Sequence, residues 1–218
     1  MQFLVIGDQS LFDELRKKLG NDHHFTHVEG IELLEYNNQF DCVFDFTAEE
    51  SIDNISELLE GVDAGLYFIN AVKSSLHEIS FLLGELPSSV IGFNGLPGFL
   101  DRDIWEVTTL ENELPAGIAD LPIRFVRVDD RVGMVTPRVI CMIINEAYYT
   151  VQEGTASRED IDLGMKLGTG YPYGPFEWAE RIGIQHVYEL LEAMYEDTRD
   201  ERYKICPLLK KEYLKNEN

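Results

Sequence analysis

The stretch from residue 2 to residue 20, QFLVIGDQSLFDELRKKLG, determines the fold expected for the first half of the chain. Residues 2–6 are an uninterrupted apolar run, which is typical of a buried strand. Residues 10–19 place leucines at every fourth position, and Ser10 is a suitable helix N-cap. The sequence therefore predicts a strand, a turn that starts at Gly7, and a helix, which is how a βαβ unit begins.

The turn itself reads GDQSLF, where a dinucleotide-binding unit carries Gly-x-Gly-x-x-Gly. Only the first glycine, Gly7, is present. In the motif the second glycine lets the backbone approach a pyrophosphate, and the third lets the helix pack closely on the strand. Gln9 and Phe12 occupy these two positions. Glu29, however, follows at the distance of a ribose-binding acid, so the turn by itself leaves dinucleotide binding open.

The rest of the chain divides into two kinds of pattern. Further strands are expected at 23–29, 40–47, 65–72, 88–95, 104–111 and 122–130, with helices at 50–61 and 74–86. This alternation indicates an α/β fold with a doubly wound parallel sheet. From about residue 133 only helical spacing recurs, and the last strong helix is expected at 186–196. We place an α/β domain at residues 1–122 and an all-α domain at residues 123–218.

Composition excludes several classes of protein. The chain has 218 residues and a formal net charge of −22, which argues against binding to nucleic acid. It has no apolar run long enough to span a membrane, no signal-peptide pattern, and three widely spaced cysteines. We expect a cytoplasmic protein without a membrane partner or a disulfide framework.

The sequence EGTASREDIDLGMKLGTGYPYGPFEWAERIGI at residues 153–184 resembles the C-terminal domain of 3-hydroxyacyl-CoA dehydrogenases. The family pattern there is approximately E-G-x-A-S-x-E-D-I-D-x-x-M-x-x-G-x-G-x-P-x-G-P-F-E, and nearly every fixed position is matched. The resemblance implies a Rossmann-like NAD-binding domain, followed by a helical dimerisation domain that makes a homodimer. It also implies NAD as cofactor, an acyl-CoA as small-molecule substrate, and a place in fatty acid metabolism.

The first half of the chain resembles the same family more faintly. The segments 41–50, 73–79 and 90–107 are similar to the family's D-x-V-I-E-A-V-x-E, N-T-S-S-L-x-I and G-M-H-F-F-N-P-V-P-V-M-K-L-V-E-V segments. A strand–helix piece of the family is missing between Glu29 and Asp41, so we expect a reduced Rossmann-like domain. The cofactor positions implied by the resemblance are Gly7, Gln9, Phe12, Glu29 and Glu49.

The catalytic positions implied by the resemblance are Ser74, Asn94, Glu106 and Pro137. The family uses a histidine as general base, a glutamate that orients it, and a serine and an asparagine that hold the substrate oxygen. Asn94 stands at the histidine position, twelve residues before Glu106, and Pro137 stands at the asparagine position. An amide cannot accept a proton at neutral pH, and proline has no polar side chain. Two of the four positions have therefore lost the groups that the reaction needs.

The leading hypothesis is a relative that is impaired or inactive as a dehydrogenase and still binds an acyl-CoA or another small ligand. The alternatives are an active NAD-dependent 3-hydroxybutyryl-CoA dehydrogenase with a displaced base, and a dimeric interaction protein without a ligand. A metal site at His23, His24 and His27 is not favoured, because no carboxylate or thiolate set completes it. Acyl hydrolysis by Ser74 with Glu106 is also not favoured. No histidine has the expected context, and the nearest, His77, lies on the following helix.

Overall fold

The seven expected strands form one sheet in the computed structural model, which describes residues 1–34, 39–111 and 113–216. The chain divides into two compact units, Met1–Met134 and Val135–Asn218. The boundary expected at residue 122 falls before the last strand, which hydrogen-bonds to its neighbour in the sheet and so belongs to the first unit.

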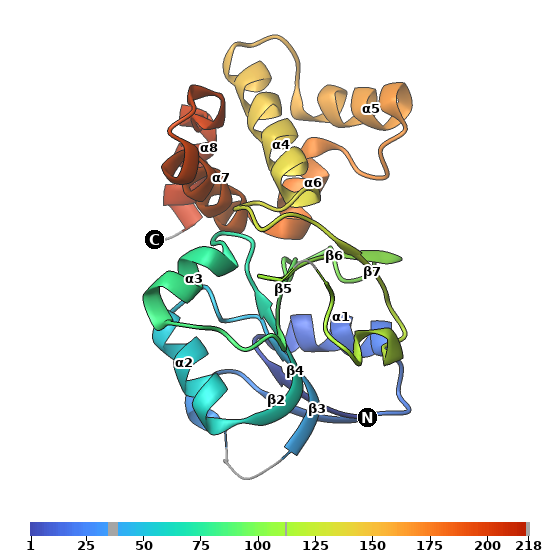
Figure 1. Ribbon diagram of the computed structural model, residues 1–218. Coiled ribbons are helices and arrows are strands. Elements are labelled where there is room, and N and C mark those ends of the chain that lie inside the picture. Colours follow the sequence, from blue (N-terminus) through green and yellow to red (C-terminus); the bar gives the residue numbers. More distant parts are fainter. Residues whose placement is uncertain (35–38, 112, 217–218) are drawn as a thin grey trace. The chain divides into compact units, whose positions relative to one another are not determined.

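The α/β unit is built on a sheet with the strand order β2-β1-β3-β4-β5-β6-β7 (Figure 1). The strands are β1 (Gln2–Ile6), β2 (His24–Val28), β3 (Gln39–Asp45), β4 (Asp63–Asn70), β5 (Val90–Phe93), β6 (Ile104–Thr108) and β7 (Arg124–Arg127). The strands from β2 to β5 are parallel, with β1 in register between β2 and β3. The predicted doubly wound sheet is confirmed.

Helices cover both faces of this sheet, as Figure 1 shows. Helix α1 (Gln9–Leu19) packs on one face through Leu11, Phe12, Leu15 and Leu19. Helices α2 (Ile52–Gly61) and α3 (Leu76–Leu83) pack on the other face, together with the short 3-10 helix η1 (Ile31–Leu33). Because side chains alternate along a strand, each central strand supplies apolar groups to both cores. Residues 35–38, in the segment where a piece of the family pattern is missing, lie outside the described residues.

One strand pair differs from the expected parallel arrangement. β5 and β6 are antiparallel, while β6 and β7 are parallel. The connection from β5 to β6 contains no helix, and a parallel connection needs a long crossover. The connection from β6 to β7 is longer and contains the 3-10 helix η2 (Ile118–Asp120). The strands β2 and β7 are the two edges of the sheet.

The second unit is entirely helical. It contains α4 (Thr136–Gln152), α5 (Arg158–Thr169), α6 (Pro175–Ile182), α7 (Ile184–Thr198), η3 (Glu201–Tyr203) and α8 (Pro207–Asn216). The helical spacing expected from about residue 133 is confirmed, and the helix expected at 186–196 corresponds to α7, whereas α8 was not expected. Across the described residues, none of the helices combines the length and the apolar character that crossing a membrane requires.

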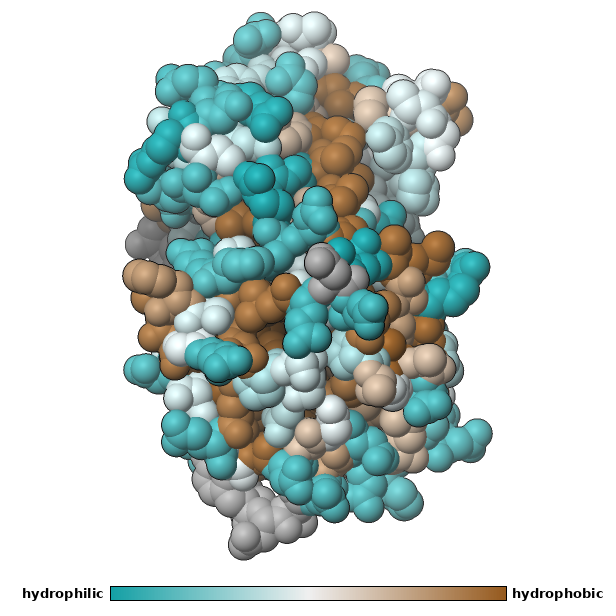
Figure 2. Space-filling model, viewed as in Figure 1, coloured by the Kyte–Doolittle hydropathy of each residue, from teal (hydrophilic) through white to brown (hydrophobic). Residues whose placement is uncertain are grey.

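Some apolar side chains of the helical unit remain exposed. Val139 on α4 and Leu163 and Leu167 on α5 are exposed, and Leu167 is the most exposed of them at 78%. Figure 2 shows a strip of apolar side chains beside α4 on the visible face of this unit.

Candidate functional site

The carboxyl ends of β1 and β3 lie side by side at the point where the strand order reverses. Ligands of doubly wound sheets bind outside the strand ends at such a point. Ile6, the last residue of β1, is in register with Asp45, the last residue of β3. The residues that follow, Gly7 and Phe46, are therefore the first groups that a ligand would meet.

The space around Gly7 is occupied by the protein's own groups. Gly7 has a φ of +141°, and a Cβ added to it would lie 2.9 Å from the Cβ of Phe46. Its carbonyl oxygen lies 2.7 Å from Nε2 of His27. Its N–H donates to the carbonyl of Val28 at 3.0 Å. Both polar groups of this turn residue are already paired within the protein.

Phe12 completes this closed arrangement from the first turn of α1. Its ring stacks on the imidazole of His27, with centroids 4.5 Å apart and planes at 9°. Phe12 is 9% exposed and belongs to the core on the α1 side of the sheet. Gln9, the first residue of α1, is exposed, and its amide donates to Asp13 at 2.9 Å. The residues at the two missing-glycine positions therefore act in packing and in a local hydrogen bond.

The three histidines near the N-terminus have separate environments. His27 contacts Gly7 and Phe12, His23 lies edge-on to Phe3 with centroids 5.1 Å apart, and His24 is exposed. Within the described residues, no group of three or more His, Cys, Asp and Glu could hold a metal ion. Glu29 is exposed and directly follows β2, at the same end of the sheet as Gly7.

Glu49 connects the loop of Ser74 to the ends of β4 and β5. Its Oε1 accepts hydrogen bonds from the backbone N–H of Lys73 and, at 3.2 Å, of Ser74. Its Oε2 accepts from Nδ2 of Asn70 at 3.1 Å, and Oδ1 of Asn70 accepts from the N–H of Gly95 at 3.0 Å. Loss of water raises the pKa of Glu49 to about 7, although the nearby charge of Lys73 opposes the rise.

Asn94 and Glu106 are brought together by the antiparallel pairing of β5 with β6. The N–H of Asn94 donates to the backbone carbonyl of Glu106 at 3.4 Å. The side chain of Asn94 is 9% exposed, and its Oδ1 accepts from the N–H of Leu96 at 3.3 Å. This amide holds its own turn, as asparagine commonly does, and it offers no group that takes up a proton at neutral pH.

Pro137 lies in the other unit, buried in the first turn of α4. Proline is well suited to this place, because its fixed φ fits a helix and the first N–H groups have no intrahelical partner. The structure thus brings Ser74, Asn94, Glu49 and Glu106 into one network of the α/β unit, whereas Pro137 starts a helix.

Two groups at this end of the sheet were missed from the sequence. Phe46 was not singled out, since its contact with Gly7 depends on the register of β1 with β3. Asp45 is 1% exposed, and its Oδ1 accepts from the N–H and the hydroxyl of Thr47, both at 2.8 Å. Its Oδ2 has no hydrogen-bond partner among the described residues. Burial raises the pKa of Asp45 to about 6. An aspartate two residues before a threonine is a turn signal that was available in the sequence.

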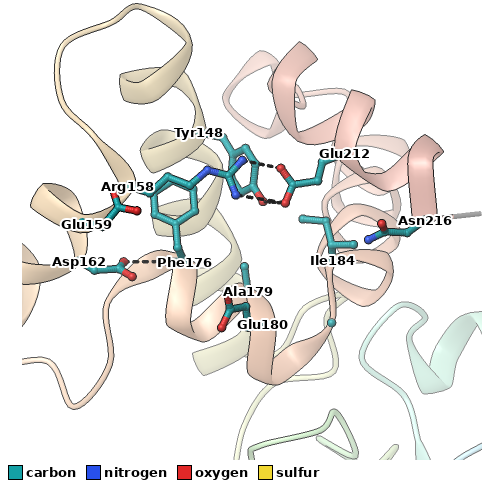
Figure 3. A pocket seen from close by; sticks show the side chains of 11 residues that line it. Tyr148, Arg158, Glu159, Asp162, Phe176, Ala179, Glu180, Ile184, Glu212 and Asn216 are labelled. Carbon is teal, nitrogen blue, oxygen red and sulfur yellow. Dashed lines mark hydrogen bonds and ion pairs between the residues drawn. The ribbon is translucent and has the colours of Figure 1, made fainter.

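The helical unit contains a separate pocket of about 430 Å³, shown in Figure 3. Arg158 makes a two-pronged ion pair with Glu212 of α8, and its guanidinium lies over the rings of Tyr148 and Phe176. The hydroxyl of Tyr148 donates to Glu212 at 2.9 Å. The hydrogen bond from Arg158 lowers the pKa of Glu212. Because the charges of Arg158 and Glu212 pair with each other, the cluster holds α8 against the other helices of this unit.

Comparison with known proteins identifies relatives of both parts of the chain. Residues 133–218 match the family model described as 3-hydroxyacyl-CoA dehydrogenase, C-terminal domain. The chain is 43% identical over 88 residues to 3-hydroxyadipyl-CoA dehydrogenase of Escherichia coli. These aligned residues make up 40% of this chain and 18% of that protein. It is 29% identical over 167 residues to 3-hydroxybutyryl-CoA dehydrogenase of Clostridioides difficile, and this alignment covers 76% of this chain and 52% of that protein.

The fold is also shared with solved structures. The crystal structure of (S)-3-hydroxybutyryl-CoA dehydrogenase from Ralstonia eutropha superposes with a TM-score of 0.73 at 18% identity, covering 99% of this chain and 94% of that one. The chain spans between 18% and 52% of the two curated relatives named above. The expected fold class is confirmed. The expected resemblance to 3-hydroxyacyl-CoA dehydrogenases is confirmed for the second half of the chain, where residues 133–218 match the C-terminal domain of that family.

Proposed function

We propose, from the membership of residues 133–218 in the 3-hydroxyacyl-CoA dehydrogenase family, that this protein no longer oxidises 3-hydroxyacyl-CoA with NAD but still binds an acyl-CoA. The observation that carries the proposal is the closed turn after β1. There Phe46, Phe12 and His27 occupy the surroundings of Gly7. The residues present do not fit a pyrophosphate, which needs free backbone N–H groups and close approach.

The loss of the base supports the same proposal. Asn94 stands where the family has its histidine, and its amide is used within its own turn. Without a group that accepts the hydroxyl proton, hydride transfer from the adjacent carbon is not assisted. Loss of the cofactor turn and loss of the base are independent changes in the chain, and both remove the same reaction.

Retention of an acyl-CoA is supported by the loop of Ser74. Glu49 holds the backbone of this loop through two N–H groups, and Asn70 connects it to the turn of Asn94. Lys73 adds a positive charge beside Ser74 in a chain of strongly negative net charge. A serine hydroxyl on a held loop, next to a cation, suits a thioester carbonyl attached to an anionic carrier.

Calorimetry with acetoacetyl-CoA and with NAD, each added separately to the purified chain, tests the proposal. We expect binding of acetoacetyl-CoA, no measurable binding of NAD, and no NADH formation from 3-hydroxybutyryl-CoA. Ser74→Ala should weaken acetoacetyl-CoA binding. Ser56→Ala is the matched control, because Ser56 is a half-buried serine of α2 whose hydroxyl donates to Glu60. NADH formation at an ordinary turnover would refute the proposed loss of activity.

The second candidate is an active dehydrogenase with a displaced base, and Glu29 is the observation that favours it. Glu29 is exposed directly after β2, where an acid could bind a ribose hydroxyl. This candidate requires NAD binding at micromolar affinity that Glu29→Ala removes. Glu32→Ala, in the following 3-10 helix, serves as its control.

We also propose that a second copy of the chain covers the exposed apolar residues of α4 and α5. Val139, Leu163 and Leu167 would otherwise leave an apolar surface in water. Leu167→Glu should convert a dimer into a monomer in sedimentation experiments. Phe81→Glu, at an equally exposed position in the α/β unit, should leave the mass unchanged. A cytoplasmic location is part of the same proposal.

A further inference from the structure

His77 and Asp130 form a close side-chain pair in the α/β unit that the family positions do not include. Nδ1 of His77 lies 2.6 Å from Oδ2 of Asp130. The two residues are 53 positions apart in the chain, and they meet at the N-terminus of α3. The side chain of Asp130 is 6% exposed, whereas that of His77 is 71% exposed.

The backbone of α3 holds the carboxylate of Asp130 in place. Its Oδ1 accepts from the N–H of Leu76 at 2.8 Å, and its Oδ2 accepts from the N–H of His77 at 2.9 Å. A carboxylate in such a site can only accept, so Nδ1 of His77 must carry the hydrogen. The neutral imidazole then has its lone pair on Nε2 of this exposed side chain. A buried carboxylate that fixes the tautomer of an accessible histidine is the arrangement of a general base.

The pair lies next to the loop that Glu49 holds. Ser74 is three residues before His77, and its backbone N–H donates to Glu49. Asn94 supplies no base to this end of the sheet, and the turn around Gly7 is closed to a dinucleotide pyrophosphate. A base without a hydride acceptor can still activate water.

We propose that the His77–Asp130 pair is a general-base site for the hydrolysis of acyl thioesters. Nε2 of His77 takes a proton from water while the water oxygen bonds to the thioester carbonyl carbon. The carbon–sulfur bond then breaks, and the leaving sulfur takes the proton from the imidazolium. The products are a carboxylic acid and a thiol, without oxidation or reduction. Asp130 is a positioning residue in this reaction. The choice of acyl-CoA as natural substrate rests on the proposed function, whereas the chemistry of the pair does not.

S-acetyl-N-acetylcysteamine, a thioester without a nucleotide, is the probe for this reaction in the full chain. NMR would follow the release of acetate. We expect a protein-dependent rate that His77→Gln lowers by about 10²-fold, the usual scale of general-base assistance. His24→Gln, at an exposed histidine of β2, should leave the rate unchanged. Equal rates in the His77→Gln and His24→Gln proteins would overturn the proposal.

The tautomer of His77 distinguishes a positioning role of Asp130 from a merely structural one, and Asp130→Asn tests it. Nitrogen-15 NMR of the wild-type imidazole should show hydrogen on Nδ1, and Asp130→Asn should shift the population toward the other tautomer and slow hydrolysis. Hydrogen on Nε2 in the wild type would contradict the proposal. Acetoacetyl-CoA binding without His77-dependent hydrolysis would leave the proposed function standing and reject the dyad. His77-dependent hydrolysis without such binding would do the reverse.

Discussion

The turn after β1 and the loop before α6 both contain glycine and lead into helices, and they have opposite relations to the family pattern. The loop before α6 matches that pattern and is packed tightly. The carboxylate of Asp162 accepts from the N–H groups of Phe176 at 2.8 Å and Glu177 at 3.2 Å, and the carboxylate of Glu177 accepts from the N–H of Gly174 at 3.0 Å. The turn after β1 departs from the pattern, and side chains fill it. Gly174, which the packing of the loop before α6 requires, is present, whereas larger residues, Gln9 and Phe12, stand at the second and third glycine positions of the turn after β1.

The two tryptophans make the comparison measurable. Trp105 is buried in the α/β unit and Trp178 in the helical unit, and the chain has no others. Their fluorescence in single-tryptophan backgrounds therefore reports the unfolding of each unit separately, which a chain with two compact units requires.

Phe12→Ala is expected to have the largest effect, because it removes a buried ring from the closed turn. We expect a loss of about 3–4 kcal/mol in the unfolding free energy of the α/β unit. Urea unfolding followed by Trp105 fluorescence measures it. Phe81→Ala, at a side chain that is 86% exposed, should change stability little. If Phe12→Ala were as mild as Phe81→Ala, the ring would not be a packing residue and the comparison between the turns would fail.

Asp45 makes the stability of the α/β unit depend on pH. The helical unit does not contain this residue and should not show the same dependence. Its pKa is about 6 in the folded protein against 3.8 as the ordinary value, so the folded state holds the proton more tightly. The contribution of this carboxyl group to the unfolding free energy is fully present below about pH 4 and is lost as the pH rises through 6. The stability of Asp45→Asn relative to the wild type should therefore improve by about 2.4 kcal/mol between pH 4 and 7. Urea titrations at a series of pH values test this; a constant difference would exclude a raised pKa.

Gly174→Ala tests the packed loop of the helical unit. An added Cβ would collide with the carboxylate of Asp162, which would have to leave the N–H groups of α6. We expect a loss of about 2 kcal/mol in the helical unit, followed by Trp178 fluorescence. Gly168→Ala in α5 is the matched control, since its added Cβ would meet none of the described residues outside its own stretch of helix within 4 Å. If Gly174→Ala left the unfolding free energy unchanged, the loop before α6 would tolerate a larger side chain as well as the turn after β1 does.

Ser157→Ala should have the smallest effect of the four. The hydroxyl of Ser157 accepts from the N–H of Asp160 at 3.1 Å and caps α5. Removal of such a cap costs about 1 kcal/mol. Thermal unfolding read at Trp178 should show the loss, and Ser157→Thr should restore most of it. A loss as large as that of Phe12→Ala would indicate a role beyond capping.

Much of the fold could be predicted from local patterns. All seven strands and most helices follow from apolar runs and helical spacing, because burial of one face imposes that spacing. Helix α8 was missed because its ten residues include one fully buried leucine, Leu209, and otherwise largely polar groups. The antiparallel pairing of β5 with β6 was missed because pairing direction depends on the connection.

The candidate site was less predictable, since its contacts join distant segments. Asn94 and Pro137 were identified by position alone, and the sequence indicated what these residues cannot do. Phe46 and His27, which fill the turn, lie close to Gly7 only because β1 pairs in this register with β3 and β2. The pairing of His77 with Asp130 is equally invisible in the sequence.

The edge strand β7 has a consequence for the behaviour of the chain in concentrated solution. An open edge offers unpaired backbone groups to other strands and so promotes aggregation. Arg124 and Arg127 stand at the two ends of this four-residue strand, two of only 18 basic residues in the chain. A second chain that added a strand here in antiparallel register would bring its own arginines against these two. The short, charged edge thereby discourages sheet extension between molecules.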